Sequence, residues 1–146
     1  MTDSSDLFDH TKWQLVPGHA LAALEWREVA ASDTELAMEL DVTPRILNSS
    51  DVVQGGLLAT LADIVAGSLL MRNFKPGIRY TTSDLHISFL APARRGPIRA
   101  TAKLLRRGRR SAVVRVEMSD EGDGSRHVAS ATLTFATLAR IDEAPS

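Results

Sequence analysis

Hydrophobic and polar positions alternate along most of the chain with a period of two, which is typical of half-buried β-strands. The alternation is clear over residues 36–42, and Leu24 and Trp26 begin an earlier strand around residues 21–30. It returns in four later stretches, over residues 85–89, 98–104, 114–118 and 129–135. Glycine-containing turns at 106–110 and 120–124 separate the last three of these. We therefore expect hairpins there, joining antiparallel strands.

One segment breaks the alternation. From Gly55-Gly56 to about Arg72 or Asn73 the chain is apolar without a period of two, which predicts a long helix. Apolar residues surround this helix on all sides, so we expect it to be buried. Two strands, a helix and four strands predict a single α+β domain over residues 1–146, with an antiparallel sheet wrapped around a central helix. Residues 1–20 are expected to form a peripheral N-terminal segment.

Asp63 is the only charged residue between Gln54 and Met71. A carboxylate in so apolar a segment must be desolvated or have a dedicated partner, and both situations are costly. Chains retain such groups mainly where the carboxylate takes part in chemistry. Asp63 is therefore the leading candidate for a catalytic residue, and the alternative is a structural ion pair or cap at a subunit contact.

Composition narrows the possible functions. The net charge of −1 favours neither nucleic acid nor membrane as a partner, and the absence of cysteine excludes disulfides and thiolate catalysis. The four histidines are scattered without the spacing of metal ligands, so no metal is expected. Because the N-terminus is acidic and the apolar segment is short and interrupted, we expect a cytoplasmic protein.

Positive charge is concentrated in one stretch. Residues 94–115 contain nine basic residues and no acidic one. Local positive charge on a nearly neutral protein favours a small polyanionic ligand. The alternative is a solvated strand face that ends in a basic hairpin tip.

Several of these motifs together resemble a known family. Asn48, Gln54-Gly55-Gly56 and Leu61-Ala62-Asp63 resemble the Asn…His-Gly-Gly…Asp signature of hotdog-fold acyl-CoA thioesterases, in the phenylacetate-degradation and acyl-CoA thioesterase 13-like branch. Residues 82–94 are similar to the family strand that ends in Pro-Ala-Lys/Arg. Arg106-Arg107-Gly108-Arg109 resembles its basic-Gly-basic hairpin. The resemblance covers residues from about 35 to 138.

The resemblance implies hydrolysis of a fatty or aryl acyl-CoA to the free acid and CoA. The backbone N–H of Gly55, at the positive end of the helix dipole, would polarise the thioester carbonyl. Asp63 would act as nucleophile or general base, and the sequence leaves both roles open. Asn48 would position water or the carbonyl, with an ordinary Asx turn as the alternative, and Thr82 would help place the water. Gln54 replaces the usual histidine and cannot titrate.

CoA is then part of the substrate, and no separate cofactor is expected. The resemblance implies CoA contacts from Phe89, Arg94, Arg106, Arg107, Gly108, Arg109, Arg110 and Ser111. It also implies a homodimer with a continuous sheet, commonly paired into a tetramer. The active site would lie between subunits, with Asn48 and Gly55 of one chain facing Asp63 and Thr82 of the other.

Two other functions remain open. Gln54 favours a non-catalytic acyl-CoA-binding hotdog module, whereas the retained Asp63, Asn48 and Gly55 argue against it. A hotdog dehydratase or hydratase is disfavoured because neither the loop nor the helix contains a histidine.

Overall fold

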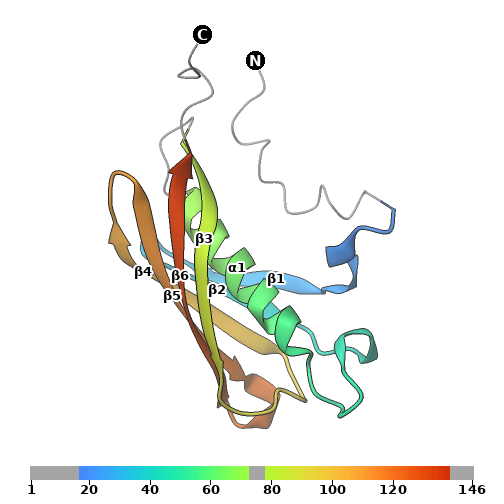
Figure 1. Ribbon diagram of the computed structural model, residues 1–146. Coiled ribbons are helices and arrows are strands. Elements are labelled where there is room, and N and C mark those ends of the chain that lie inside the picture. The colour runs from blue at the N-terminus through green and yellow to red at the C-terminus, as the bar shows by residue number, and fades with distance from the viewer. Residues whose placement is uncertain (1–16, 73–77, 139–146) are drawn as a thin grey trace.

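The computed structural model describes residues 17–72 and 78–138, and these form one antiparallel sheet with a helix across it (Figure 1). The sheet order is β1-β2-β4-β5-β6-β3. The helix is α1 (Gly55–Arg72). The strands are β1 (Trp26–Ala31), β2 (Glu35–Leu40), β3 (Arg79–Phe89), β4 (Ile98–Arg107), β5 (Ser111–Asp120) and β6 (Arg126–Leu138). The predicted hotdog architecture of an antiparallel sheet wrapped around a long helix is confirmed.

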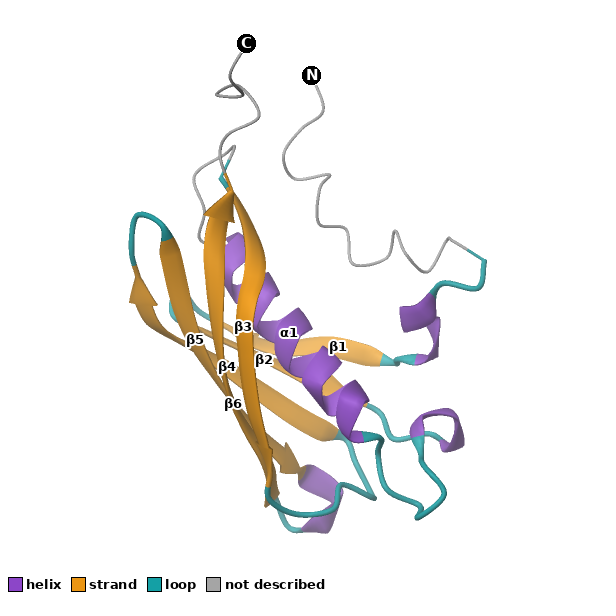
Figure 2. Cartoon of the chain, in the orientation of Figure 1, coloured by secondary structure: helices purple, strands orange, loops and turns teal. Residues whose placement is uncertain are grey.

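The core lies between α1 and the concave face of the sheet (Figure 2). Alternate residues of each strand point to this side, and Leu36, Met38 and Leu40 of β2 are fully buried there. The helix makes its most extensive sheet contacts with β4. Two small residues on that strand, Ala100 and Ala102, are fully buried and let the helix pack closely against the strand.

The segment before β1 differs from the prediction. The expected strand over residues 21–30 begins only at Trp26, because residues Ala20–Ala23 form a short 3₁₀ helix, η3. The His19 side chain caps this helix, since its Nδ1 accepts the N–H of Leu21 at 3.1 Å. The N-terminal segment up to residue 16 and the predicted turn at 75–77 lie outside the described residues.

The expectation that α1 is buried on all sides is wrong for a single chain. Leu58, Leu61 and Val65 are buried against the sheet, whereas Thr60 and Asp63 are only half-buried. One sheet covers one side of a helix, so apolar residues around the rest of α1 remain accessible. By length and composition alone the helix could cross a bilayer, but in this fold it packs across the sheet as core helices do.

Strand β3 forms the edge of the sheet beside this uncovered side of α1. Among the described strands it pairs only with β6, and a β-bulge interrupts that pairing between Thr82 and Asp84. The outer edge of β3 therefore presents backbone groups that a further strand could pair with.

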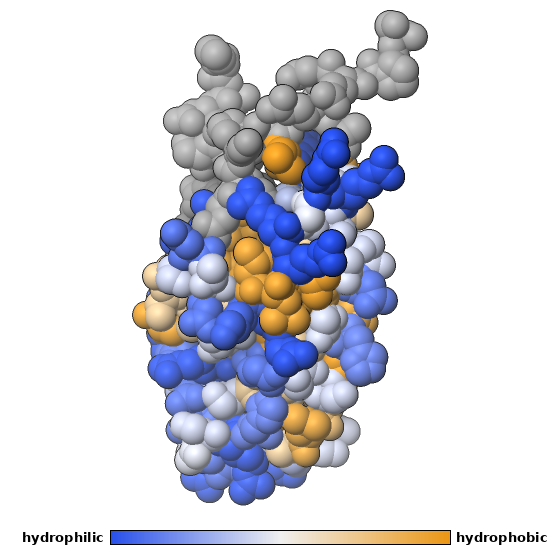
Figure 3. Space-filling model, turned by 90° about the vertical axis from the view of Figure 1, so that its left-hand side faces the viewer, coloured by the Kyte–Doolittle hydropathy of each residue, from blue (hydrophilic) through white to orange (hydrophobic). Residues whose placement is uncertain are grey.

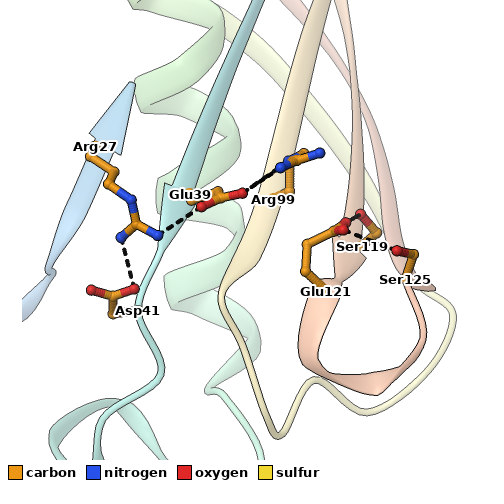
Figure 4. A network of polar contacts seen from close by, with 7 residues as sticks. All are labelled: Arg27, Glu39, Asp41, Arg99, Ser119, Glu121 and Ser125. Carbon is orange, nitrogen blue, oxygen red and sulfur yellow. Dashed lines mark hydrogen bonds and ion pairs between the residues drawn. The ribbon is translucent and has the colours of Figure 1, made fainter. Parts of the chain in front are cut away.

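On the opposite face of the sheet, a polar network links β1, β2 and β4 (Figure 4). Glu39 is buried between two arginines, with Arg27 at 2.7 Å and Arg99 at 2.6 Å. Arg27 also pairs with Asp41 at 2.8 Å. The hydrogen bond that Arg27 donates to Asp41 raises the pKa of Arg27, and those that Arg99 donates to Glu39 raise the pKa of Arg99. The two guanidinium groups thus compensate the buried negative charge of Glu39.

Candidate active site

The start of α1 is held by backbone hydrogen bonds to two distant segments. The N–H of Val53 donates to the carbonyl of Ala93 at 2.8 Å, and the N–H of Gln54 donates to Ile46 at 3.1 Å. The Gln54 carbonyl accepts the N–H of Leu57, as an N-cap residue does. The N–H groups of Gly55 and Gly56 precede the first hydrogen bond of the helix, so the helix start presents donors at the positive end of the dipole.

A largely apolar cavity of about 390 Å³ lies beside Gly55. A Cβ at Gly55 would lie 3.1 Å from Cζ of Phe89, so only glycine leaves the backbone here clear of that ring. The Phe89 side chain is itself about half exposed. The cavity is lined by Val52, Val53, Gly55, Leu58, Phe89, Leu90, Ala91, Pro92 and Ala93. A different hollow of about 440 Å³ lies beside β1, at the opposite edge of the sheet from β3, and has no part in this site.

Asp63 has a dedicated partner. The Thr82 hydroxyl donates to Oδ1 of Asp63 at 2.6 Å, which joins the uncovered side of α1 to edge strand β3. Of the two situations expected for this carboxylate, desolvation and partnering, the single chain shows the second. The Asp63 side chain is only half-buried, so its carboxylate remains accessible in one chain.

Gly55 and Asp63 do not meet within one chain. Eight residues of α-helix separate them, which corresponds to about 12 Å along the axis. A nucleophile or activated water must approach a carbonyl carbon to about 3 Å while the oxygen is held by its donor. The Gly55 amide and the Asp63 carboxylate of the same chain therefore cannot act on the same thioester.

Asn48 and Gln54 have local roles in this geometry. Oδ1 of Asn48 accepts the N–H groups of Ser50 at 2.9 Å and Val52 at 3.3 Å, which is the Asx turn weighed as the alternative. Its contribution to catalysis stays a prediction. Gln54 is exposed and adjoins Gly55.

The basic hairpin between β4 and β5 brings most of the predicted CoA contacts together. The turn is closed by the N–H of Gly108, which donates to Ser111 at 2.8 Å. Figure 3 shows hydrophilic side chains grouped around a smaller apolar area on this side of the molecule. A broad hollow of about 1030 Å³ is lined by Arg106, Gly108, Arg109, Arg110, Ser111 and Val113.

Arg94 lies far from this hairpin. It precedes β4, whereas the hairpin follows β4, and ten residues of strand separate the two by about 33 Å. The prediction grouped Arg94 with the hairpin arginines. In one chain these side chains cannot bind the same phosphate group.

Comparison with known proteins identifies the family. Residues 51–126 match the sequence pattern of the thioesterase superfamily. Mouse acyl-coenzyme A thioesterase 13 is 30% identical over 112 residues, which cover 75% of this chain and 78% of the mouse protein. The chain belongs to the thioesterase superfamily.

Solved structures agree with this assignment. A phenylacetic acid degradation-related protein from Ralstonia eutropha is 32% identical, with a TM-score of 0.72 over 84% of this chain and 96% of that one. A thioesterase from Haemophilus influenzae matches 99% of this chain and 96% of its own at 19% identity, with a TM-score of 0.80, and supports the fold alone. The predicted family, hotdog fold and enzyme class, a thioester hydrolase, are confirmed.

Two features of the candidate site were not predicted. The walls of the cavity at residues 52–53 and 90–91 come from loops whose conformation no periodic pattern encodes. Asp120, which binds the loop that forms one of these walls, was also missed. It follows Val114, Val116 and Met118 at the next inward position of β5, and an acidic residue at a core position was the available signal.

Proposed function

We propose that this thioesterase hydrolyses a fatty or aryl acyl-CoA, and that each active site forms between two copies of the chain. The observation that carries the proposal is the separation of two complementary halves on one uncovered side of the molecule. Asp63 and Thr82 form one half, and the Gly55 amide with its apolar cavity forms the other. The name of the mouse relative supports acyl-CoA as the substrate.

Pairing of two β3 edges would unite these halves. Antiparallel strands run in opposite directions, so residues near one end of β3 face residues near the other end of the partner strand. A pairing centred between Leu85 and His86, in the second half of β3, would place Thr82 opposite the partner's Phe89. Because Thr82 binds Asp63 and Phe89 packs over Gly55, the partner's Gly55 and cavity would then approach Asp63. A tetramer made of two such dimers would leave this arrangement unchanged.

The chemistry follows from the assembled site. The acyl group occupies the apolar cavity, and its carbonyl oxygen accepts the Gly55 N–H, which stabilises the negative charge that develops during attack. Asp63 of the other chain either takes a proton from the attacking water, or attacks the carbonyl carbon itself and forms a mixed anhydride that water hydrolyses in a later step. The carbon–sulfur bond then breaks, and the CoA thiolate leaves and is protonated. The net reaction consumes one water and releases a free acid and a thiol.

The phosphates of CoA would bind the hairpin of β4 and β5. Guanidinium groups bind phosphate through paired, charge-assisted hydrogen bonds. Because the two chains would run in opposite directions, the partner's Arg94 would lie at the same end of the dimer as this hairpin. Arg94 and the hairpin arginines could then serve one dimer although they lie about 33 Å apart in one chain.

A panel of acyl-CoAs that differ in chain length and in aromatic or aliphatic character tests the function directly. Release of free thiol from at least one of them, at a rate proportional to enzyme concentration, is the expected result. Binding of acyl-CoA without release of thiol would instead favour the non-catalytic acyl-CoA-binding module that Gln54 suggested.

Replacing Arg109 with alanine should raise KM for acyl-CoA several-fold with little change in kcat, because it removes a contact made equally in ground and transition states. The increase should shrink at high salt, since Arg109 is exposed and screened. Steady-state kinetics with acyl-CoA and with the matching acyl-pantetheine, which lacks the nucleotide, measure this.

The control is Arg126→Ala, which removes an exposed arginine that pairs with Asp123 and begins β6, opposite the end of β5 that is remote from the hairpin. It should leave KM unchanged. Equal losses of kcat on CoA and pantetheine substrates in Arg109→Ala would show that the hairpin is no phosphate site.

A further inference from the structure

Asp120 is fully buried at the end of β5, and its carboxylate binds three consecutive backbone amides. Oδ2 accepts the N–H groups of Arg94 at 2.9 Å and Arg95 at 3.0 Å, and Oδ1 accepts that of Gly96 at 2.7 Å. These amides belong to the loop that links β3 to β4. A buried anion that satisfies three amides at once holds their backbone in one conformation.

This loop reaches the candidate active site in two ways. Its first part, residues 90–93, forms one wall of the apolar cavity. Its Ala93 carbonyl accepts the N–H of Val53, two residues before Gly55, at 2.8 Å. A shift of the loop would therefore move both the cavity wall and the backbone that leads into α1.

The turn that follows Asp120 packs so closely against the same loop that there is no room for a side chain at Gly122. A Cβ at Gly122 would lie 2.2 Å from the carbonyl oxygen of Gly96 and 2.9 Å from Cβ of Arg95. The turn is braced by Glu121, which accepts the hydroxyls of Ser119 and Ser125 (Figure 4). The close packing and the hydrogen bonds of this turn therefore hold the Asp120 carboxylate in a fixed position.

We propose that Asp120 is a positioning residue for thioester hydrolysis, which fixes the loop at 90–96 and, through Ala93 and Val53, the place of the Gly55 amide. The proposal rests on the proposed function, because it concerns the same site. Asp120 does not touch the substrate. It acts by holding the Gly55 N–H and the cavity wall at residues 90–93 in their positions relative to each other. A misplacement of about 1 Å at such a site lowers the rate substantially.

Charge is the property that suits Asp120 to this role. Burial by itself would raise the pKa of its carboxyl, but the amides of Arg95, Arg94, Gly96 and Gly122 outweigh burial and hold the pKa below its usual value. The folded state is therefore stabilised above the ordinary aspartate pKa near 4, and this stabilisation is lost as the pH falls through the lower folded value.

Asp120→Asn tests the proposal, because asparagine keeps the shape but turns an NH₂ group toward backbone donors. We expect kcat to fall at least about tenfold at a temperature well below unfolding. Hydrogen exchange should accelerate at residues 94–96 and also at residues 53–55. As the pH falls below 4, the melting temperature of the variant should decline less than that of wild type, because the variant has no Asp120 carboxylate to protonate. The pKa of Glu121 is also lowered, by the Ser119 and Ser125 hydroxyls, but Glu121 is present in both proteins and does not account for a difference between them.

Three further variants separate positioning from stability. Asp123→Asn removes a charge from the same turn, from a residue that pairs with Arg126, and should leave kcat unchanged. Val116→Ala destabilises the core of the same strand and should lower the melting temperature without lowering kcat. Gly122→Ala should reproduce the loss of kcat, because its Cβ displaces the same loop. This variant replaces Asp120→Asn as the test if Asp120→Asn does not fold.

Normal kcat in Asp120→Asn would overturn the proposal, as would faster exchange at 94–96 with unchanged exchange at 53–55. Loss of kcat in Val116→Ala equal to that in Asp120→Asn would also overturn it, since destabilisation alone would then explain both. A wild-type protein inactive on every acyl-CoA would contradict the proposed function. The exchange at residues 53–55 would still decide whether Asp120 holds the start of α1.

Discussion

Replacing Asp63 with asparagine is expected to lower kcat by about 10²–10⁴-fold, the range that a general base contributes, and replacing it with alanine should abolish turnover. Asparagine can still accept the hydrogen bond from Thr82, but it can neither take a proton from water nor attack a carbonyl. The fold should survive, because Asp63 is only half-buried and forms no ion pair in the described residues. Thiol release and the thermal melt of each variant are the measurements.

Asp84→Asn is the matched control for Asp63→Asn. Asp84 is an exposed carboxylate on the same edge strand, and the bulge after Thr82 turns it to the opposite face of the sheet, so its replacement removes the same charge away from the site. It should keep kcat within about twofold, as expected for a surface substitution away from the reacting atoms. Near-normal kcat in Asp63→Asn would show that Asp63 is structural and that the proposed mechanism is wrong.

The second large effect is expected from Gly55→Pro. Proline is well tolerated at the first position of a helix, and it removes the one N–H that we assign to the carbonyl oxygen. Loss of an oxyanion donor typically lowers kcat by about 10²–10³-fold, or about 3–4 kcal/mol in barrier. KM should change less, since the donor interacts most strongly with the developing oxyanion.

Gly55→Ala separates the amide from the space around it. Alanine keeps the N–H, and its Cβ would press on the Phe89 ring at 3.1 Å, which can turn because the side chain is half exposed. We expect a small loss of kcat in Gly55→Ala and a large one in Gly55→Pro. Equal losses in the two variants would mean that crowding, rather than the missing donor, accounts for the effect.

Much of the fold was accessible from the sequence because each element has a clear period. The helix was predicted from Gly55 to about Arg72 or Asn73 and lies at Gly55–Arg72, since a glycine pair begins the apolar segment and polar residues follow it. The hairpins after β4 and β5 followed from their glycine-containing turns. The start of β1 was misjudged because a cap by the His19 side chain overrides strand propensity over four residues.

The site was harder to predict because its parts are joined by tertiary contacts. The sequence indicated Asp63 and Gly55, which lie eight residues apart on one helix. That separation indicates a site shared between two chains only once β3 is known to be an edge strand that a second chain can pair with. The helix was expected to be buried because apolar residues surround it, whereas part of its surface remains accessible in one chain. The role of Asp120 depends on a loop 24 to 26 residues away in sequence.

The most direct test of a site shared between two chains is complementation of two inactive variants. Asp63→Asn and Gly55→Pro are co-expressed with different affinity tags, and assemblies that carry both tags are purified. In a dimer with one chain of each kind, one site would combine the intact Gly55 of the first chain with the intact Asp63 of the second, and the other site would carry both defects. We predict recovery of about half of the wild-type activity per dimer, because one of two symmetric sites is complete. Activity no higher than that of the separate variants would contradict the shared site.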